Sequence, residues 1–204
     1  MSDNRIVFAT GNEGKMKEIR LILADLGMEI LSMKEAGADP EIVENGKTFG
    51  ENAEIKAKAV WAENGGIVLA DDSGLVVDCL NGEPGIYSAR YMGEDTSYEI
   101  KNQTIISRVN EAAGDDRSAR FVCNIAAVLP DGSVVHTEET MEGTIAEKAA
   151  GNGGFGYDPI LFLPEFGVTS AEITMEQKNR ISHRGKALEA MKRKLEEIYK
   201  GDVR

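Results

Sequence analysis

The stretch "IVLADDSGLVVD" (residues 67–78) runs four apolar residues into two adjacent carboxylates and then returns to apolar residues. Adjacent like charges repel, and a charge beside a core is costly unless another group neutralises it. Two interpretations of Asp71 and Asp72 are open. Asp, Ser and Gly suit a tight turn between two strands, which is the commoner outcome for these residues alone. Alternatively, a hard divalent cation held by carboxylates would remove the repulsion.

Length and composition predict a soluble protein with one domain over residues 1–204 and room for two lobes. The start, "MSDNRIVFATG", has no basic segment followed by a long apolar run, and no segment approaches the length of a membrane span. Cys79 and Cys123 both lie in apolar, strand-like segments, which is typical of core residues in a reducing compartment. A cytoplasmic protein with no membrane partner is therefore expected.

The net charge of -12 argues against a protein that coats a nucleic-acid polymer, because such proteins need a broad basic surface. It does not exclude a small polyanion. A few basic residues gathered in one place, helped by a metal ion, can hold a triphosphate on an acidic protein.

The hydrophobic pattern alternates helices with strands early in the chain and predicts a hairpin in its middle. Thr48 and Glu51 are spaced as a capping box, and Gly27 is a plausible helix stop. The pattern favours an α/β fold with a mixed sheet. The expected elements are a strand at 5–9, a helix at 14–27, a strand at 28–31, a helix within 48–66, strands at 66–70 and 75–80 around an acidic turn, a helix at 96–113, hairpin strands at 117–130 and 133–146 joined by Asp131-Gly132, and two helical segments after residue 162.

The segment "ATGNEGK" (9–15) ends a strand and begins a helix. Backbone amides at a helix start attract phosphate, and Lys15 adds a point charge. The segment is not a Walker A loop, because its glycines are too close together and Met16 stands where Ser or Thr should follow the lysine. Strand-to-helix turns also contain Gly and Asn for conformational reasons, so both interpretations remain open here.

Lys56 lies on the apolar face of its own helix, seven residues after Phe49 and four before Val60, and Asn52 shares that face. A lysine at such a position most often extends to solvent along the apolar surface. The alternative is that Asn52 and Lys56 reach a polar ligand.

Two later segments carry further candidates. In "GNGGFGYDP" (151–159), an exposed Phe155 or Tyr157 would offer a flat platform for a base, with Asp158 in reach of its polar edge; otherwise the aromatics fill a core. In "KNRISHRGKAL" (178–188), basic residues surround a helix start, where capping by Ser182 and a solvated basic patch are the simpler explanation. Together with the phosphate turn and the carboxylates, these segments make up the parts of a nucleotide–metal site.

Five segments in order resemble the inosine triphosphate pyrophosphatase family, also called XTP/dITP diphosphatases. They are "FATGNEGKMKEI", "TFGENAEIKAKA", "ADDSGLVVDCLNGEPGIYSARY", "GGFGYDPILF" and "ISHRGKAL", and they span residues 8–188. The resemblance implies an α/β fold with a mixed β-sheet, flanking helices and two lobes around a central active-site cleft, usually as a homodimer. It implies Mg²⁺-dependent hydrolysis of ITP, dITP and XTP to the monophosphate and pyrophosphate, which clears deaminated purines from the nucleotide pool. A nucleotide pyrophosphatase with another base preference is the alternative, and a non-hydrolysing sensor has no need of the carboxylate pair.

The resemblance also implies roles for particular residues. Asp72 would be the catalytic carboxylate and a metal ligand, with Lys56 as its catalytic partner at the phosphates. Glu44 would be the second metal ligand, although Glu41 lies close enough to compete. The substrate-binding residues would be Thr10, Gly11, Asn12, Glu13, Gly14 and Lys15 at the triphosphate, Ser73 at phosphate, and Phe155, Gly156, Tyr157, Asp158, Lys178, His183 and Arg184 at the nucleoside.

Two physical arguments refine these roles. Successive side chains of a strand point to opposite faces, so Asp71 and Asp72 are not expected to share one role, and Asp71 should support the site from behind. A donor such as Arg184 or His183 could bond O6 of hypoxanthine or xanthine, whereas adenine would leave two donors facing each other at a cost of about 1–3 kcal/mol.

Overall fold

A computed structural model describes residues 4–112, 114 and 116–201. Its strands are β1 (Arg5–Phe8), β2 (Glu29–Ser32), β3 (Ile67–Val77), β4 (Ser118–Val128), β5 (Val134–Ile145), β6 (Leu161–Leu163) and β7 (Val168–Thr169). Its α-helices are α1 (Glu13–Leu23), α2 (Phe49–Asn64), α3 (Tyr98–Ala112), α4 (Met175–Ile181) and α5 (His183–Gly201), with short 3-10 turns between them. None of the helices in the described part of the chain is long and apolar enough to cross a membrane.

The seven strands form one sheet in the order β2-β1-β3-β4-β5-β6-β7. The pairs β1–β2 and β1–β3 are parallel, whereas β5–β6 and β6–β7 are antiparallel. The expected α/β fold with a mixed sheet and flanking helices is therefore confirmed. The central cleft between two lobes stays a prediction.

The chain divides into two compact units, and the three longest strands each run through both. Unit 1 comprises the described residues of Met1–Asp72, Cys123–Glu139 and Arg184–Arg204, and unit 2 comprises those of Ser73–Val122 and Thr140–His183. The boundary in β3 follows directly after Asp72, so both adjacent aspartates belong to unit 1.

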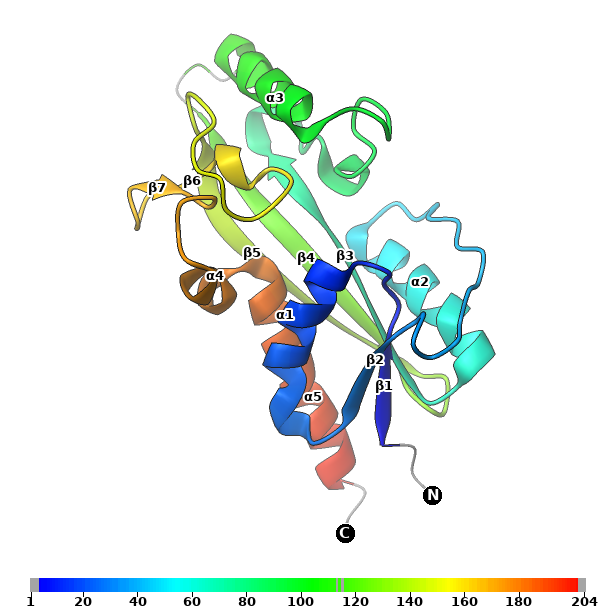
Figure 1. Cartoon of the computed structure of the whole chain (residues 1–204). Coiled ribbons are helices and arrows are strands. Elements are labelled where there is room, and N and C mark those ends of the chain that lie inside the picture. The colour runs from blue at the N-terminus through cyan, green and yellow to red at the C-terminus, as the bar shows by residue number, and fades with distance from the viewer. Residues whose placement is uncertain (1–3, 113, 115, 202–204) are drawn as a thin grey trace. The chain divides into compact units, whose positions relative to one another are not determined.

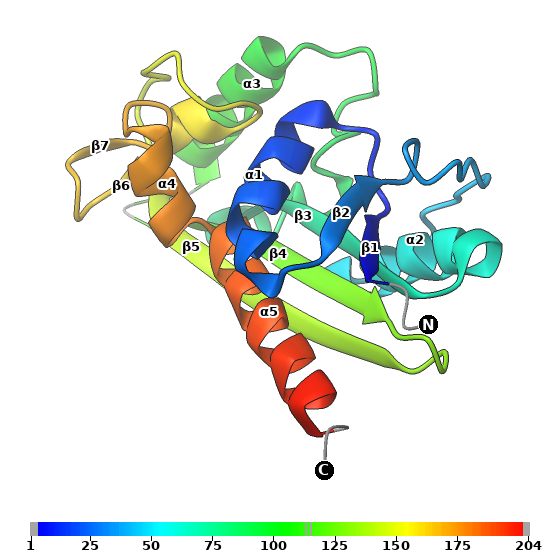
Figure 2. The same ribbon diagram turned by 60° about the horizontal axis from the view of Figure 1, so that its bottom comes forward.

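Unit 1 packs helices on both faces of its strands (Figure 1). Ile6 and Phe8 of β1 contact one core cluster with α1 and α5, while Val7 and Ala9 contact the other cluster with α2. The helices α1 and α5 come from opposite ends of the chain and lie side by side (Figure 2). Strands buried on both faces read as continuous apolar runs, which explains the composition of β1 and the start of β3.

Unit 2 has its own apolar core, which includes the helix α3. Ile105, Ile106 and Val109 of α3 pack with Leu75 and Val77 of β3. Tyr157 belongs to the same core and is only 4% exposed.

The acidic segment is not a turn. β3 runs without interruption from Ile67 to Val77 and includes Asp71, Asp72 and Ser73, so the prediction of two short strands around a turn was wrong. A continuous strand is possible there because each carboxylate contacts basic side chains on its own face of the strand.

Other boundaries shift slightly from their predictions. The first helix ends through a 3-10 turn at Gly27, whose φ of 64° is the predicted left-handed stop. Only half of the predicted capping box forms, because Thr48 accepts from the Glu51 amide while the Glu51 carboxylate accepts from the Lys47 amide. The predicted end of the helix 96–113, Ala113, lies outside the described residues.

Candidate active site

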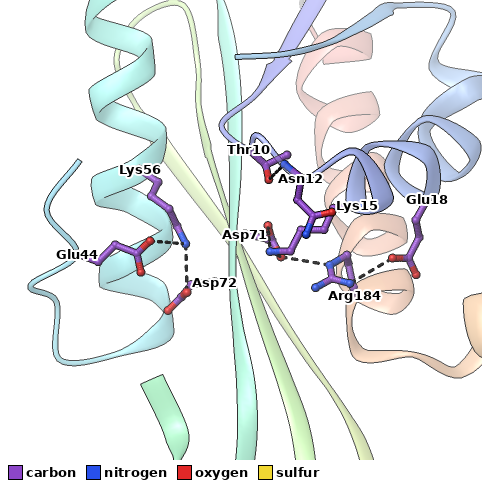
Figure 3. Close-up of polar contacts among 9 residues, drawn as sticks. All are labelled: Thr10, Asn12, Lys15, Glu18, Glu44, Lys56, Asp71, Asp72 and Arg184. Carbon is purple, nitrogen blue, oxygen red and sulfur yellow. Dashed lines mark hydrogen bonds and ion pairs between the residues drawn. The ribbon is translucent and has the colours of Figure 1, made fainter. Parts of the chain in front are cut away.

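Strand alternation places Asp71 and Asp72 on opposite faces of β3 (Figure 3). Leu69, two residues before Asp71, contacts the core beneath α1 and α5, and Ala70, two residues before Asp72, contacts the core beneath α2. The two carboxylates therefore share no cation, and each has separate partners. This confirms that the two side chains point to opposite faces of the strand, while their different roles stay a prediction.

Asp71 is nearly buried, at 2% exposure, between α1 and α5. Its carboxylate accepts from Lys15 Nζ at 3.0 and 3.1 Å and from Arg184 Nε at 3.2 Å. Arg184 is itself buried and also donates to Glu18 at 3.2 Å. Burial alone would raise the pKa of Asp71, but the charges of Lys15 and Arg184 hold it well below its usual range. Asp71 thus favours its charged form at neutral pH and joins two helices through its ion pairs.

Asp72 faces α2, where its two oxygens have different partners. Lys56 Nζ donates to Oδ1 at 3.1 Å, and Asn52 Nδ2 donates to Oδ2 at 3.2 Å. Burial raises the pKa of Asp72 above its ordinary value, although Lys56 opposes the shift. The same strand therefore carries one aspartate with a lowered pKa and one with a raised pKa.

The Lys56 ammonium lies between two carboxylates. It is 3.1 Å from Asp72 Oδ1 and 3.4 Å from Glu44 Oε1, and the lysine side chain is 13% exposed. Burial alone would lower the pKa of Lys56, but Asp72, Asp71 and Glu44 together raise it. Lys56 therefore does not extend to solvent, and its contact with a polar ligand stays a prediction.

The first turn of α1 is built by its preceding segment. Asn12 caps the helix by accepting from the Lys15 amide at 3.1 Å, and Thr10 Oγ1 accepts from the Asn12 amide at 3.1 Å. Most of this predicted phosphate turn, from Gly11 to Gly14, is exposed. These contacts also determine where α1 begins, and the first turn of α1 places Lys15 in contact with Asp71.

The predicted nucleoside residues of unit 2 form a second cluster. Phe155 is 57% exposed, and Lys178 Nζ lies 5.2 Å from the centroid of its ring. Asp158 is buried; it accepts from Lys178 Nζ at 2.5 Å, from the Phe155 amide at 2.8 Å and from Ser170 Oγ at 2.8 Å. Asp158 therefore fixes the Phe155 loop and Lys178, rather than standing free to reach a base as the sequence had suggested.

Tyr157 is not the exposed platform that the sequence left open. Its hydroxyl donates to the Ser88 carbonyl at 2.8 Å, and its ring packs edge-on against Tyr98. Burial raises the pKa of the Tyr157 hydroxyl above 10. Of the two aromatics, Phe155 alone keeps an exposed face.

The three basic residues of "KNRISHRGKAL" do not act as one patch. Lys178 lies in α4 against Asp158, and His183 begins α5 with its ring stacked on Phe121 at a centroid distance of 5.0 Å. Arg184 contacts Asp71 and Glu18, so the expectation that it bonds a base finds no support in these contacts. Ser73 follows Asp72 in β3, and Gly156 lies in the loop beside Tyr98.

Sequence reasoning missed Glu18 and the use that the fold makes of Asn52. Glu18 lies one turn after Lys15 on a charged helix and looks like an ordinary surface residue. Its link to Arg184 spans 166 residues, so no local pattern could reveal it. The sequence indicates that Asn52 shares a face with Lys56, but it does not identify the hydrogen-bond partners of Asn52.

Comparison with known proteins places this geometry in a family. The model of the Ham1 family matches residues 6–194. A dITP/XTP pyrophosphatase of Clostridium perfringens is 46% identical, with 96% of this chain and 99% of the relative covered. A dITP/XTP pyrophosphatase of Geobacter sulfurreducens is also 46% identical, over 92% and 94%. These names confirm the resemblance drawn from the five sequence segments.

Solved structures agree with the sequence relatives. A HAM1 protein from Coxiella burnetii superimposes with a TM-score of 0.88 at 39% identity, covering 95% of this chain and 98% of that one. The Ham1 protein of Staphylococcus aureus gives 0.86 at 40% identity, over 94% and 98%. With matches that run almost from end to end in sequence and in structure, this chain is a member of the Ham1 family.

Proposed function

We propose that this chain hydrolyses non-canonical purine nucleoside triphosphates such as dITP, XTP and ITP to the nucleoside monophosphate and pyrophosphate. The observation that carries the proposal is the Asp72 carboxylate with its raised pKa, held by Lys56 on one face of β3, in a chain whose relatives are named dITP/XTP pyrophosphatases. The reaction removes deaminated purines from the nucleotide pool.

Asp72 and Glu44 suit a magnesium ion. Among the described residues, no three His, Cys, Asp or Glu side chains gather into a complete metal cage. Mg²⁺ needs no such cage, because it commonly binds one or two carboxylates together with water and the phosphates of a substrate. The position of the Lys56 ammonium between these two carboxylates indicates that they already attract a cation. When bound there, Mg²⁺ would neutralise charge on the phosphate oxygens.

The other steps of the hydrolysis are assigned to side chains of unit 1. Asp72 takes a proton from the water that attacks the α-phosphorus, while Lys56 and Asn52 hold its two oxygens in place. The bond between the α-phosphorus and its bridging oxygen breaks, and that oxygen leaves with pyrophosphate. Lys15 and Lys56 stabilise the charge on this leaving group. Asp71, through Lys15 and Arg184, holds α1 and α5 in place behind the reaction.

In this proposal the residues around Phe155 and Lys178 select the base. The exposed face of Phe155 offers a surface for stacking, and Asp158 fixes both that loop and Lys178. The proposal assigns Lys178 and His183 as donors to O6 of a hypoxanthine or xanthine ring. A homodimer in the cytoplasm, as the resemblance and the composition imply, completes the proposal.

The test is a panel of nucleoside triphosphates incubated with the protein and Mg²⁺, followed by separate measurement of pyrophosphate and orthophosphate. The proposal expects pyrophosphate and a monophosphate from dITP, XTP and ITP, with much slower release from ATP. Preferred cleavage of a pyrimidine or methylated nucleotide would replace the substrate class. Orthophosphate and a nucleoside diphosphate as first products would overturn the site of cleavage.

A further inference from the structure

Asn52 is a buried polar side chain in the first turn of α2, with 0% exposure and no part in the chemistry described above. Its Oδ1 accepts from the Gly46 amide at 2.9 Å, and its Nδ2 donates to Asp72 Oδ2 at 3.2 Å. Only one orientation of the amide satisfies both contacts, because a backbone N–H can only donate and a carboxylate only accepts. Asn52 is therefore a two-ended link between residue 46 and Asp72.

The segment at Gly46 lies as close to α2 as a backbone can. A Cβ atom at Gly46 would stand 2.7 Å from Asn52 Oδ1 and 2.8 Å from the Cβ of Glu51, so a larger residue would push the segment away. The next amide, that of Lys47, donates to the Glu51 carboxylate at 2.6 Å. These contacts fasten the segment two residues after Glu44.

The same link controls the rotation of the Asp72 carboxylate. Lys56 holds Oδ1 and Asn52 holds Oδ2, so the plane of the carboxylate is fixed by one partner at each oxygen. Each oxygen keeps a further lone pair for a water or a cation. If the Asn52 donor were lost, Lys56 alone would hold Asp72, and Lys56 is shared with Glu44.

We propose that Asn52 is a positioning residue of the hydrolysis: it orients the Asp72 carboxylate and, through Gly46, holds Glu44 opposite to it. The inference rests on the proposed function for its kinetic consequences only. The arrangement of the two carboxylates that it describes exists before any substrate binds.

Two substitutions separate the two ends of the link. Asn52→Asp keeps an acceptor for the Gly46 amide but replaces the donor to Asp72 with a second acceptor. Asn52→Ala removes both contacts. The matched control is Asn64→Ala, because Asn64 lies on the same helix and its Nδ2 donates to the Ala36 carbonyl at 3.0 Å, away from the carboxylates. Each protein is measured for kcat, KM and melting temperature, and is titrated with Mn²⁺ alone.

Loss of a residue that orients a metal-binding or catalytic carboxylate typically costs about 10–100-fold in activity or metal affinity. We expect kcat to fall by that factor in both Asn52 variants while KM changes by less than roughly threefold, because Asn52 is fully buried and both ends of its amide contact the protein. Asn52→Ala should also bind Mn²⁺ about tenfold more weakly, because Glu44 is released. Asn64→Ala should lower the melting temperature but keep kcat and Mn²⁺ affinity.

The inference is overturned if both Asn52 variants keep kcat within roughly threefold of the wild type, or if Asn64→Ala loses as much turnover as they do. An unchanged Mn²⁺ affinity in Asn52→Ala overturns the part that concerns Glu44. If the wild-type protein releases no pyrophosphate from dITP or XTP, the proposed function fails. The Mn²⁺ titration needs no turnover, and it still decides whether Asn52 positions the two carboxylates.

Discussion

Replacing Asp71 and Asp72 one at a time with asparagine should give opposite results from neighbouring positions. Asp71 is 2% exposed and neutralises Lys15 and the buried Arg184. Removing one partner of a buried ion pair costs about 3–5 kcal/mol, because the other charge stays buried without compensation. For a chain of this length each kcal/mol lowers the melting temperature by roughly 2–4 °C, so Asp71→Asn should lose roughly 6–20 °C.

Asp72→Asn should instead leave the fold almost unchanged. The raised pKa of Asp72 means that burial disfavours its charge, and Lys56 keeps Glu44 as a partner when that charge is removed. We expect a change in stability of about 1 kcal/mol or less, in either direction. Turnover should fall by about 10²–10⁴-fold, which is the usual contribution of a general base.

The assay pairs thermal unfolding of each variant with release of pyrophosphate from dITP or XTP at saturating Mg²⁺. Asparagine has nearly the same shape as aspartate, so each substitution tests charge rather than packing. Equal losses of stability at the two positions would refute the division of the pair between opposite faces of β3. Near-normal turnover in Asp72→Asn, with an inactive but stable Asp71→Asn, would reverse the two roles.

Three further predictions follow from the same contacts. Lys56→Met should lower kcat by more than it raises KM, because negative charge builds up on the leaving pyrophosphate in the transition state. It should also lower the melting temperature, because Asp72 and Glu44 lose the ammonium that they share. Unchanged kinetics would leave Lys56 with a packing role only. Glu44→Gln should raise the Mg²⁺ concentration needed for half-maximal rate, and a Mg²⁺ titration that overlays the wild type would remove Glu44 from the metal site. The lowered pKa of Asp71 means that its ion pairs stabilise the folded protein above about pH 4 and that this stabilisation is lost as the pH falls through the lowered pKa. The difference in unfolding free energy between wild type and Asp71→Asn should therefore shrink on acidification below about pH 4, and a difference that grows there would contradict the sign of the shift.

The sequence predicted the elements of unit 1 well because their signals are local. The apolar spacing of α1, the stop at Gly27 and the Thr48 cap all act within a few residues. Strand alternation alone was enough to predict that Asp71 and Asp72 point to opposite faces. The position of Lys56 on an apolar face likewise indicated that it does more than face solvent.

The errors arose where the deciding partner lies far away in the chain. A turn was expected between the strands 66–70 and 75–80 because Asp, Ser and Gly suit turns, and the sequence could not show that Arg184, 113 residues away, neutralises Asp71 within a continuous strand. Asp158 was expected to face a base, but its carboxylate accepts hydrogen bonds from Ser170 and Lys178 instead. No spacing rule links such residues, so the single sequence could suggest that they carry function but not which atoms they contact.

The position of the aspartate pair in β3 also defines how insertions and deletions must act. A strand that is buried on both faces has a fixed register, because a shift by one residue would force Leu69 into the place of the smaller Ala70 and leave Ala70 in the place of Leu69. The charges cannot exchange places either. Deletion of one residue before Asp71 would bring Asp72 between Lys15 and Arg184 and turn Ser73 toward Lys56. Arg184 would keep a carboxylate partner, but the attacking water would lose its general base. Asp71 would at the same time move to the fully buried place of Ala70 beneath α2, where no basic partner is found among the described residues of that core. Such a chain would lose stability together with activity, so homologues that fold and act in the same way are expected to have no gap at this place.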